Sequence, residues 1–496
     1  MELRLQKEQM EQMTCVVNRT AEDTFNADVV VPDALPDVAA VHLTDGDFCL
    51  WRMDLSSGAA EAEGEWKGTV CCSAETDGGV FSFPVSVGVR LRIHNDGIKP
   101  ELRPYASFRV KDVQTQLMNS RKLRVKVRVS CALRCYASEM IEFTNGLESA
   151  PPDVYTRLEP LSFSVVAGVE EQVFTAGGSS GLRASPMNGM LLASHSVTAD
   201  EQTQISAGRA VLSGTVCTDV LYLTEDRTPV HEMIRTPFSQ LLDLEQLHSD
   251  DTLQVSLQLT AAELLLHGEN TLETEFHIVV QMLQMRSVEV SVLTDAYSVG
   301  KKIAAETETS GFALREAENA IHFQAEAEAG EGKTGESVLA VYPRLRLLQQ
   351  KEDLLEGETQ VWILLASADG FLRSVSCVVP FSGDLAPGTE IISVDIDSAS
   401  AQIVSGSIRA GVSITSKCCR SESVQICQIM GLEQSETESS CETSASVTLV
   451  RREEGQDLWG LAKRYASSVE AIGQANALCA EETKCPYLLV PRIRLQ

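Results

Sequence analysis

The sequence predicts a mainly β protein in which three tandem antiparallel β-rich domains are followed by a small βααβ domain. Three observations indicate this fold class. The body of the chain repeats itself, its apolar residues alternate with polar ones, and its C-terminal end reads as strand, helix, helix, strand. Internal repetition marks a chain built of similar units, and period-two alternation marks strands with one buried and one solvated face.

The clearest repeat is a hairpin-like segment. Gly214–Ser239 aligns without gaps onto Gly357–Ser382, and both end on Pro-Phe-Ser. A weaker copy starts at Gly68. Each copy has an alternating segment, a polar turn and a second alternating segment, which is typical of an antiparallel hairpin.

Each repeat then closes on a long alternating strand. The apolar positions are Leu123, Val125, Val127, Val129, Cys131 and Leu133 in the first, Leu272, Thr274, Phe276 and Ile278 in the second, and Ile408, Ala410, Val412 and Ile414 in the third. Such alternation favours antiparallel sheets over a parallel α/β fold. Short helices are expected only in places such as Ala261–His267 or within Pro237–Leu247.

These signals divide the chain into five parts. Paired prolines at 151 and 152 separate the first two β domains, because proline interrupts both helices and strand ladders. A polar, acidic stretch before the C-terminal module predicts a flexible linker. The expected domains are 1–147 for the N-terminal segment and first β domain, 153–298 for the second, 299–432 for the third, 433–446 for the linker and 447–496 for the module.

The module has a strand at Leu449–Val450, two short helices and a final strand at Leu488–Pro491. In that order and spacing it resembles the LysM module, a βααβ domain that binds N-acetylglucosamine-containing glycans or, in some settings, proteins. Asp457 is expected to cap the first helix, and Ser467 with Glu470 to form a capping box for the second. The resemblance implies a shallow groove flanked by Gln456, Asp457, Asn476, Ala477, Leu478 and Tyr487.

The module departs from the LysM pattern in two places beside this groove. Gln456 stands where the pattern has an acidic residue, and Cys485-Pro486-Tyr487 replaces a Pro-Gly turn. Both changes weigh against sugar binding and leave the fold intact. Three cations, Arg464, Arg492 and Arg494, are candidate contacts for a protein partner with acidic loops.

The N-terminal region carries a second resemblance. The phrase from Val29 to Val38 (VVVPDALPDV) resembles the opening of the SPOCS domain of endospore-forming Firmicutes, and Arg121–Val125 resembles its closing strand. Several such units followed by one LysM-like module is the layout of SipL-type spore coat morphogenetic proteins of clostridia. The resemblance implies a structural role in the mother cell at the forespore surface, through binding to the ATPase that polymerises as the coat's basement layer.

The net charge of the chain excludes some classes of binding partner. With 41 basic and 70 acidic residues, the chain has a formal charge of −29. This argues against nucleic acid and against anionic membrane surfaces, which both require dense positive charge. The N-terminus shows no apolar signal segment and no apolar run is long enough to span a bilayer, so a cytoplasmic location is expected. Most of the fourteen cysteines lie in apolar runs and are expected to be buried thiols.

One strand face has an unusual charge. Arg124, Lys126 and Arg128 alternate with the apolar positions of the first closing strand, whereas the second closing strand shows Glu273 and Glu275 there. Two ordinary solvated faces are the simpler interpretation. The alternative is that opposite charges align neighbouring units or chains, which would support self-association.

No motif indicates catalysis or a cofactor. Gly330–Thr334 ends like a phosphate-binding loop but lacks its first glycine, and the eight histidines show no metal-ligand spacing. The sequence therefore predicts a non-enzymatic scaffold without metal or cofactor. The competing prediction is a protein that binds spore or cell-wall peptidoglycan through its C-terminal module.

Overall fold

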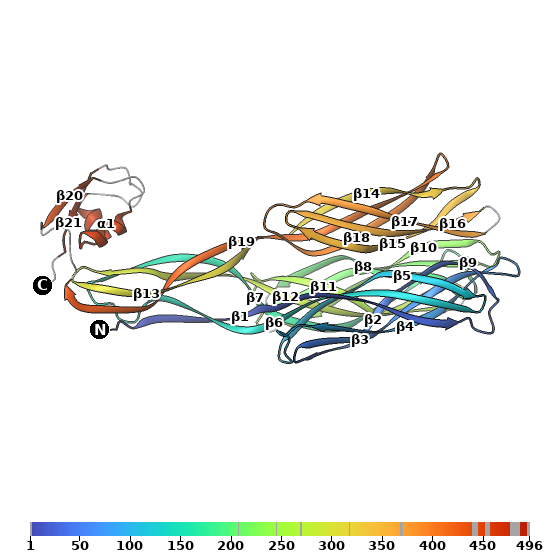
Figure 1. Ribbon diagram of the computed structural model, residues 1–496, viewed down its shortest axis with the longest axis horizontal. Helices are drawn as coiled ribbons and strands as arrows, with labels where there is room; N and C mark the ends of the chain where they lie inside the picture. Colours follow the sequence, from blue (N-terminus) through green and yellow to red (C-terminus); the bar gives the residue numbers. More distant parts are fainter. Residues whose placement is uncertain are drawn as a thin grey trace.

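The structure, a computed structural model, describes nine stretches of the chain. These are residues 2–206, 208–244, 246–267, 270–316, 318–367, 371–438, 445–451, 457–476 and 487–493, with only the backbone described at 188, 189 and 436–438. The described chain is dominated by antiparallel strands and has two short helices (Figure 1). The prediction of a mainly β, antiparallel fold is confirmed.

The first unit contains strands β1 to β6. They are β1 Leu5–Val30, β2 Val38–Ser56, β3 Ala59–Ala74, β4 Val80–His94, β5 Arg103–Asn119 and β6 Lys122–Leu147. One sheet has the order β1-β6-β5 and the other the order β2-β3-β4. The two sheets enclose a core that includes Trp66, Val85 and Val125.

The second unit repeats this arrangement with six further strands. They are β7 Val154–Gly181, β8 Pro186–Ser206, β9 Arg209–Thr224, β10 Pro229–Leu242, β11 Thr252–His267 and β12 Thr271–Ser298. Its sheets have the orders β11-β12-β7 and β10-β9-β8. As in the first unit, the first strand pairs with the last, which lies at the centre of its sheet.

The third unit follows the same plan, with its first strand divided in two. Its strands are β13 Lys301–Arg315, β14 Asn319–Glu331, β15 Glu336–Lys351, β16 Leu354–Ser367, β17 Leu372–Asp384, β18 Thr389–Val404 and β19 Ser407–Glu438. β13 and β14 both pair with β19, which also pairs with β18, and the facing sheet has the order β15-β16-β17. The shared strand order gives the three units the same sheet topology.

The alternating closing strands bury the faces that the sequence indicates. On β6 the side chains of Leu123, Val127 and Leu133 are completely buried, and on β12 so are those of Phe276 and Ile278. β-branched and aromatic side chains pack well on a pleated surface that has one buried face. The buried-thiol prediction is confirmed at Cys71, Cys72, Cys131, Cys135, Cys217, Cys418 and Cys419, among others, whereas Cys15 and Cys427 are exposed.

The Pro-Phe-Ser repeat has a packing explanation. Phe238 pairs with Gly214 across β9 and β10, and Phe381 pairs with Gly357 across β16 and β17. A Cβ on Gly214 would lie 2.6 Å from the Phe238 ring. Each glycine therefore leaves room for the phenylalanine ring on the neighbouring strand, a device known to stabilise glycine in sheets.

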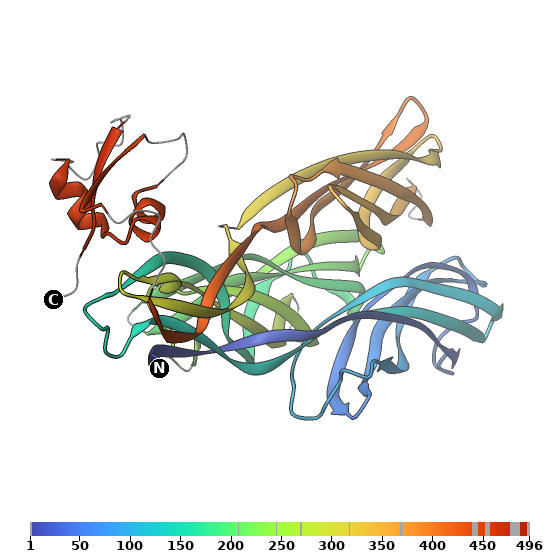
Figure 2. The same ribbon diagram turned by 60° about the vertical axis from the view of Figure 1, so that its left-hand side comes forward.

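The long first and last strands of the units come together in a stem. Figures 1 and 2 show this stem at the end that carries both termini, with the sheet pairs of the three units spreading from the other end. Phe143, Phe163 and Phe312, one from each unit, meet in its core with ring centroids 4.5–5.6 Å apart. The accessible surface of 25,754 Å² exceeds the roughly 18,000 Å² expected of a compact monomer of this mass.

The three units also share a second hydrophobic cluster, formed by residues on strands of all three units. Leu43, Leu221 and Leu364 contribute apolar contacts there, again one from each unit. A charged group crosses the same junction and consists of Asp45, His195 and Arg344, also one from each unit. We call these three residues the hub triad.

The hub triad is buried and mutually paired. Arg344 donates to the carboxylate of Asp45 and, at 3.2 Å, to the carbonyl oxygen of Gly46. His195 Nδ1 lies 3.2 Å from Asp45 Oδ2. Burial disfavours protonation of His195, but the neighbouring Asp45 carboxylate outweighs it and raises the pKa of His195 to about 9. Burial likewise disfavours ionised Asp45, yet His195 and Arg344 hold its pKa below the usual range.

Two local predictions are wrong. Ala261–His267 is not helical but lies in β11, paired with β12, and Pro237–Leu242 lies in β10. The expected linker also begins too early, because residues 433–438 continue β19 and pair with β13. In each case pairing with a distant strand decides the backbone conformation, and local propensity does not. Residues 439–444 of the expected linker lie outside the described residues.

Candidate partner-binding site at the C-terminal module

The C-terminal module has the order β20, α1, α2, β21. These are β20 Val447–Arg451, α1 Leu458–Arg464, α2 Val469–Ala475 and β21 Tyr487–Pro491. The two strands pair antiparallel, and one face of their sheet packs on the helices. The buried core consists of Leu461, Ala462, Ala466, Ile472, Leu488 and Val490. Val469, the first residue of α2, is 37% exposed.

Caps fix where the two helices begin. Asp457 is the N-cap of α1, and its carboxylate accepts a hydrogen bond from the Gly460 amide at 2.9 Å, as predicted. The second cap is Ser468, whose hydroxyl accepts from the Ala471 amide, and not Ser467. Ser467 is buried, with its carbonyl oxygen bonded to the Tyr297 hydroxyl. The second helix therefore begins one residue later than predicted, and the backbone of Ser467 contacts the body of the chain.

Half of the predicted groove residues are described, and they have different roles. Asp457 is engaged at the N-terminus of α1, whereas Tyr487 is more than half exposed at the start of β21. Asn476 exchanges hydrogen bonds with the Leu489 backbone and donates to the Ile472 carbonyl oxygen, so it ties α2 to β21. Gln456, Ala477 and Leu478 lie outside the described residues.

Two of the three candidate cations of the module are described. Arg464 lies in the last turn of α1, with its guanidinium 5.7 Å from the centre of the Tyr465 ring. Arg492 follows β21 and its backbone amide donates to the Ser446 carbonyl oxygen. Arg494 lies outside the described residues.

The helix side of the module is docked on the stem through Asp295. The indole N–H of Trp459 donates to its carboxylate at 2.8 Å, and Lys463 pairs with the same group at 2.7 Å. Burial raises the pKa of the Asp295 carboxyl, but these two donors outweigh burial and lower it.

Three stem residues complete this contact. Arg157 on β7 pairs with Asp457 at 2.8 Å. The Tyr297 ring packs edge-on against Trp459 and stacks on Tyr155. Sequence reasoning missed Arg157, Asp295 and Tyr297, because no motif marks them and only the folded chain brings them to the module.

The opposite side of the module is a solvent-facing apolar surface. Val447 and Leu449 on β20, together with Tyr487 and Leu489 on β21, point away from the module's core and are exposed. We call these four residues the sheet face. Leu449 pairs directly with Leu489, and Tyr487 pairs with Arg451 at the border of the surface.

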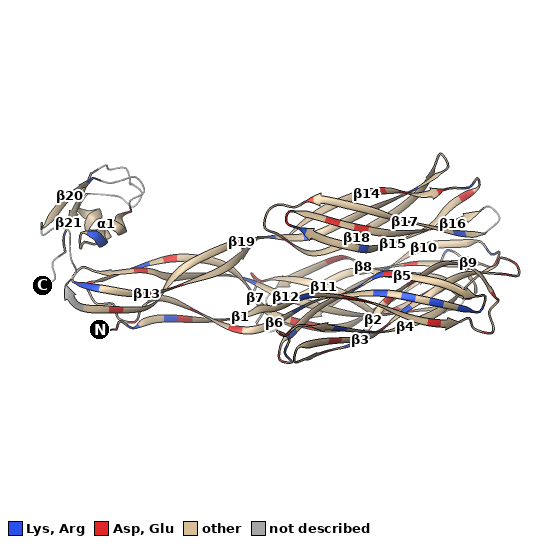
Figure 3. Ribbon diagram, in the orientation of Figure 1, with Lys and Arg blue, Asp and Glu red and all other residues tan. Residues whose placement is uncertain are grey.

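The predicted cationic stripe lies on the solvent face of β6 (Figure 3). Arg124 pairs with Asp28 on β1 at 2.7 Å. Arg128 lies 3.6 Å from Glu22 and 3.8 Å from Asp112. Lys126 makes no ion pair within the described part of the chain. Two of the three cations therefore have partners in their own sheet.

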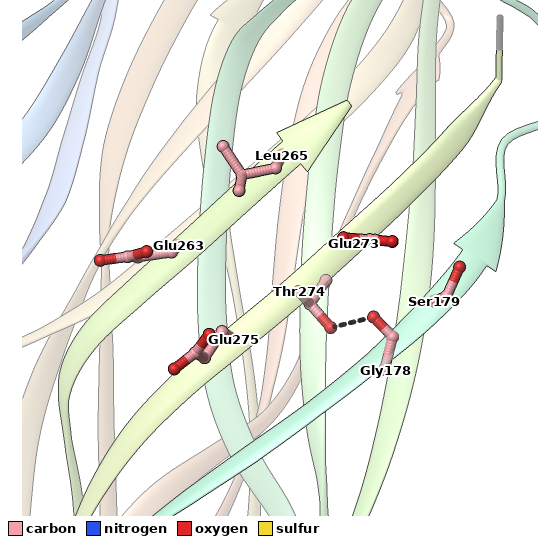
Figure 4. Close-up of a pocket in the computed structure, with 7 residues that line it drawn as sticks. All are labelled: Gly178, Ser179, Glu263, Leu265, Glu273, Thr274 and Glu275. Atoms are coloured by element: carbon pink, nitrogen blue, oxygen red, sulfur yellow. Dashed lines mark hydrogen bonds between the residues drawn. The ribbon is translucent and has the colours of Figure 1, made fainter. Parts of the chain in front are cut away.

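The equivalent face of the second unit is a shallow acidic hollow of about 280 Å³ (Figure 4). Glu263, Glu273 and Glu275 line it, and the Thr274 hydroxyl donates to the Gly178 carbonyl oxygen at its floor. Within the described residues, no group of three His, Cys, Asp or Glu side chains is placed to hold a metal ion. The hollow by itself indicates no chemistry.

Comparisons with known proteins do not place the chain in a family. No protein-family model matches it, and neither a curated protein nor a solved structure does. In the described part of the chain, no helix is both long and apolar enough to cross a membrane.

Proposed function

We propose that this chain is a non-enzymatic scaffold that binds a partner protein through its C-terminal module. The observation that carries the proposal is the way the module is held. Asp295, Arg157 and Tyr297 fix its helix side at the end of an elongated β stem, while its sheet face stays exposed. Such an arrangement presents one small surface at a fixed position on a large body.

The family resemblance gives the scaffold a setting. The three units with shared topology correspond in this proposal to tandem SPOCS-like domains, and the βααβ module to a LysM-like domain. The partner is then the ATPase of the spore coat's basement layer. The location is the mother-cell side of the forespore, where the scaffold would tether that layer.

The structure supports a protein partner over a glycan. Asp457 is engaged by Arg157, and all polar atoms of the Asn476 amide are used inside the module. Sugar recognition needs polar groups with free hydrogen-bonding capacity. Among the described residues of the module, the open sheet face is mainly aliphatic, and the buried centre of a protein interface is more apolar than the rest of a protein surface.

The test is binding by the complete chain. We expect the purified protein to bind the immobilised coat-basement ATPase and not to sediment with purified peptidoglycan. Deletion of residues 447–496 should abolish ATPase binding while the β units remain folded by circular dichroism. Sedimentation with peptidoglycan without ATPase binding would replace the scaffold by the glycan-binding alternative.

A further inference from the structure

The sheet face departs from the usual pattern of a two-stranded sheet. Its side chains expose 52% at Val447, 64% at Leu449, 56% at Tyr487 and 42% at Leu489. Antiparallel sheets with one solvated face normally place polar residues on that face. Here the apolar character continues on both sides, because Val450, Leu488 and Val490 face the helices.

The exposed fractions apply to the whole chain with the module docked. The stem contacts involve Asp457, Trp459, Lys463 and Ser467, all on the helix side. None of the four sheet-face residues takes part in those contacts. Docking therefore leaves the sheet face open to another molecule, and contiguous exposed apolar side chains on a soluble protein mark interaction sites.

Charge at the border indicates the chemistry of that molecule. Arg451 is exposed beside Tyr487 and makes no ion pair among the described residues. Residues 447–496 together carry seven Lys or Arg and six Asp or Glu residues, so the module is close to neutral in a chain of net charge −29. A complementary surface is therefore apolar at its centre and bears carboxylates at its edge.

We infer that the sheet face, bordered by Arg451, is the surface through which the module binds an apolar, carboxylate-rimmed patch on its protein partner. This inference rests on the proposed function and deepens it, because it assigns the contact to the sheet and not to the groove beside the helices. A single aromatic ring among aliphatic side chains offers few hydrogen bonds to a sugar, whereas such a surface suits protein burial.

The test compares charged substitutions at two equally exposed apolar positions. Leu449→Asp alters the sheet face, and Val173→Asp alters β7, where Val173 is also 64% exposed. With the coat-basement ATPase as the probe, we expect Leu449→Asp to weaken binding by the full chain by about tenfold or more and Val173→Asp to leave it unchanged. Arg451→Glu should weaken binding chiefly at low salt, since an exposed charge is screened as ionic strength rises.

Each result decides between named alternatives. If Leu449→Asp and Arg451→Glu both bind the ATPase as tightly as the wild-type chain does, the inference is overturned and the proposed function still stands. A wild-type chain that does not bind the ATPase would overturn both. If Leu449→Asp binds the ATPase normally but no longer self-associates, the sheet face binds a second copy of the chain. If Leu449→Asp loses only peptidoglycan binding, the sheet face binds glycan. Thermal unfolding of each variant shows that lost binding does not come from lost folding.

Discussion

The imidazole of His195 in the second unit lies 3.2 Å from the carboxylate of Asp45 in the first, inside the junction of the three units. Arg344 from the third unit bonds to the same carboxylate. One acidic group therefore holds two cations from two other parts of the chain. Buried charges are tolerated when they are paired in this way, and removing one partner leaves an uncompensated charge.

The hub triad predicts that stability falls in alkaline solution. The folded-state pKa of His195 is about 9, above its ordinary value near 6.5. A raised folded-state pKa gives a contribution that is complete below pH 6.5 and is lost as pH rises through about 9. We expect the free energy of unfolding to decline between these values, as measured by urea denaturation, and His195→Gln to make the decline shallower. An identical slope in both proteins would contradict the pairing.

The Asp45–Arg344 pair predicts strong coupling in unfolding. Asp45→Asn should destabilise the chain by about 3–5 kcal/mol, because it leaves the buried Arg344 without its carboxylate partner. Arg344→Met should cost less, because Asp45 keeps His195 as a partner. The double variant should lose clearly less than the sum. Additive losses in a double-mutant cycle would show that the two side chains do not interact in solution.

Matched glycine substitutions test the Pro-Phe-Ser packing. Gly214→Ala should destabilise the second unit by about 1–3 kcal/mol, because the new methyl group would overlap the Phe238 ring. Gly88 on β4 is the control, since a Cβ there would meet no atom within 4 Å. Gly88→Ala should be neutral or stabilising by up to about 1 kcal/mol. Equal effects on thermal unfolding would argue against the ring contact.

Docking of the module on the stem depends on Asp295. Asp295→Ala removes the acceptor of Trp459 and the ion-pair partner of Lys463. We expect faster amide hydrogen exchange in α1 and around Ser467, with exchange in β6 unchanged. Glu289→Ala, an exposed position on the same strand, is the control. Unchanged exchange in the Asp295 variant would mean that other contacts hold the module.

The role of the cationic stripe on β6 (Arg124, Lys126 and Arg128) in self-association stays a prediction. Lys126→Glu is the cleanest change, because Arg124 and Arg128 already have partners within their sheet. If the stripe aligns neighbouring chains, sedimentation velocity at low salt should show weaker association for the variant, and the difference should vanish at high salt. If the variant and the wild-type chain associate equally at both salt concentrations, the stripe has no role in self-association.

Sequence patterns predicted what depends on neighbouring residues along one strand or helix. The alternation at Leu123–Leu133 predicted a strand with a buried face, and Asp457 was recognised as a helix cap. Both features are local, since side chains two apart on a strand share a face and a cap binds an amide in the first helical turn. The repeat that ends on Pro-Phe-Ser was visible as well, although its reason became clear only when Phe238 was found opposite Gly214.

Tertiary structure alone decided how distant segments meet. Ala261–His267 has the composition of a helix, yet it pairs as a strand with β12, and β19 continues past the expected end of its unit because β13 lies beside it. The hub triad and the Asp295 contact join residues that are far apart in the sequence and belong to no motif. The sequence by itself determined which faces must be buried, because burial follows from local periodicity. Which residues contact one another between two buried faces depends on how whole units pack, and local sequence patterns do not contain that information.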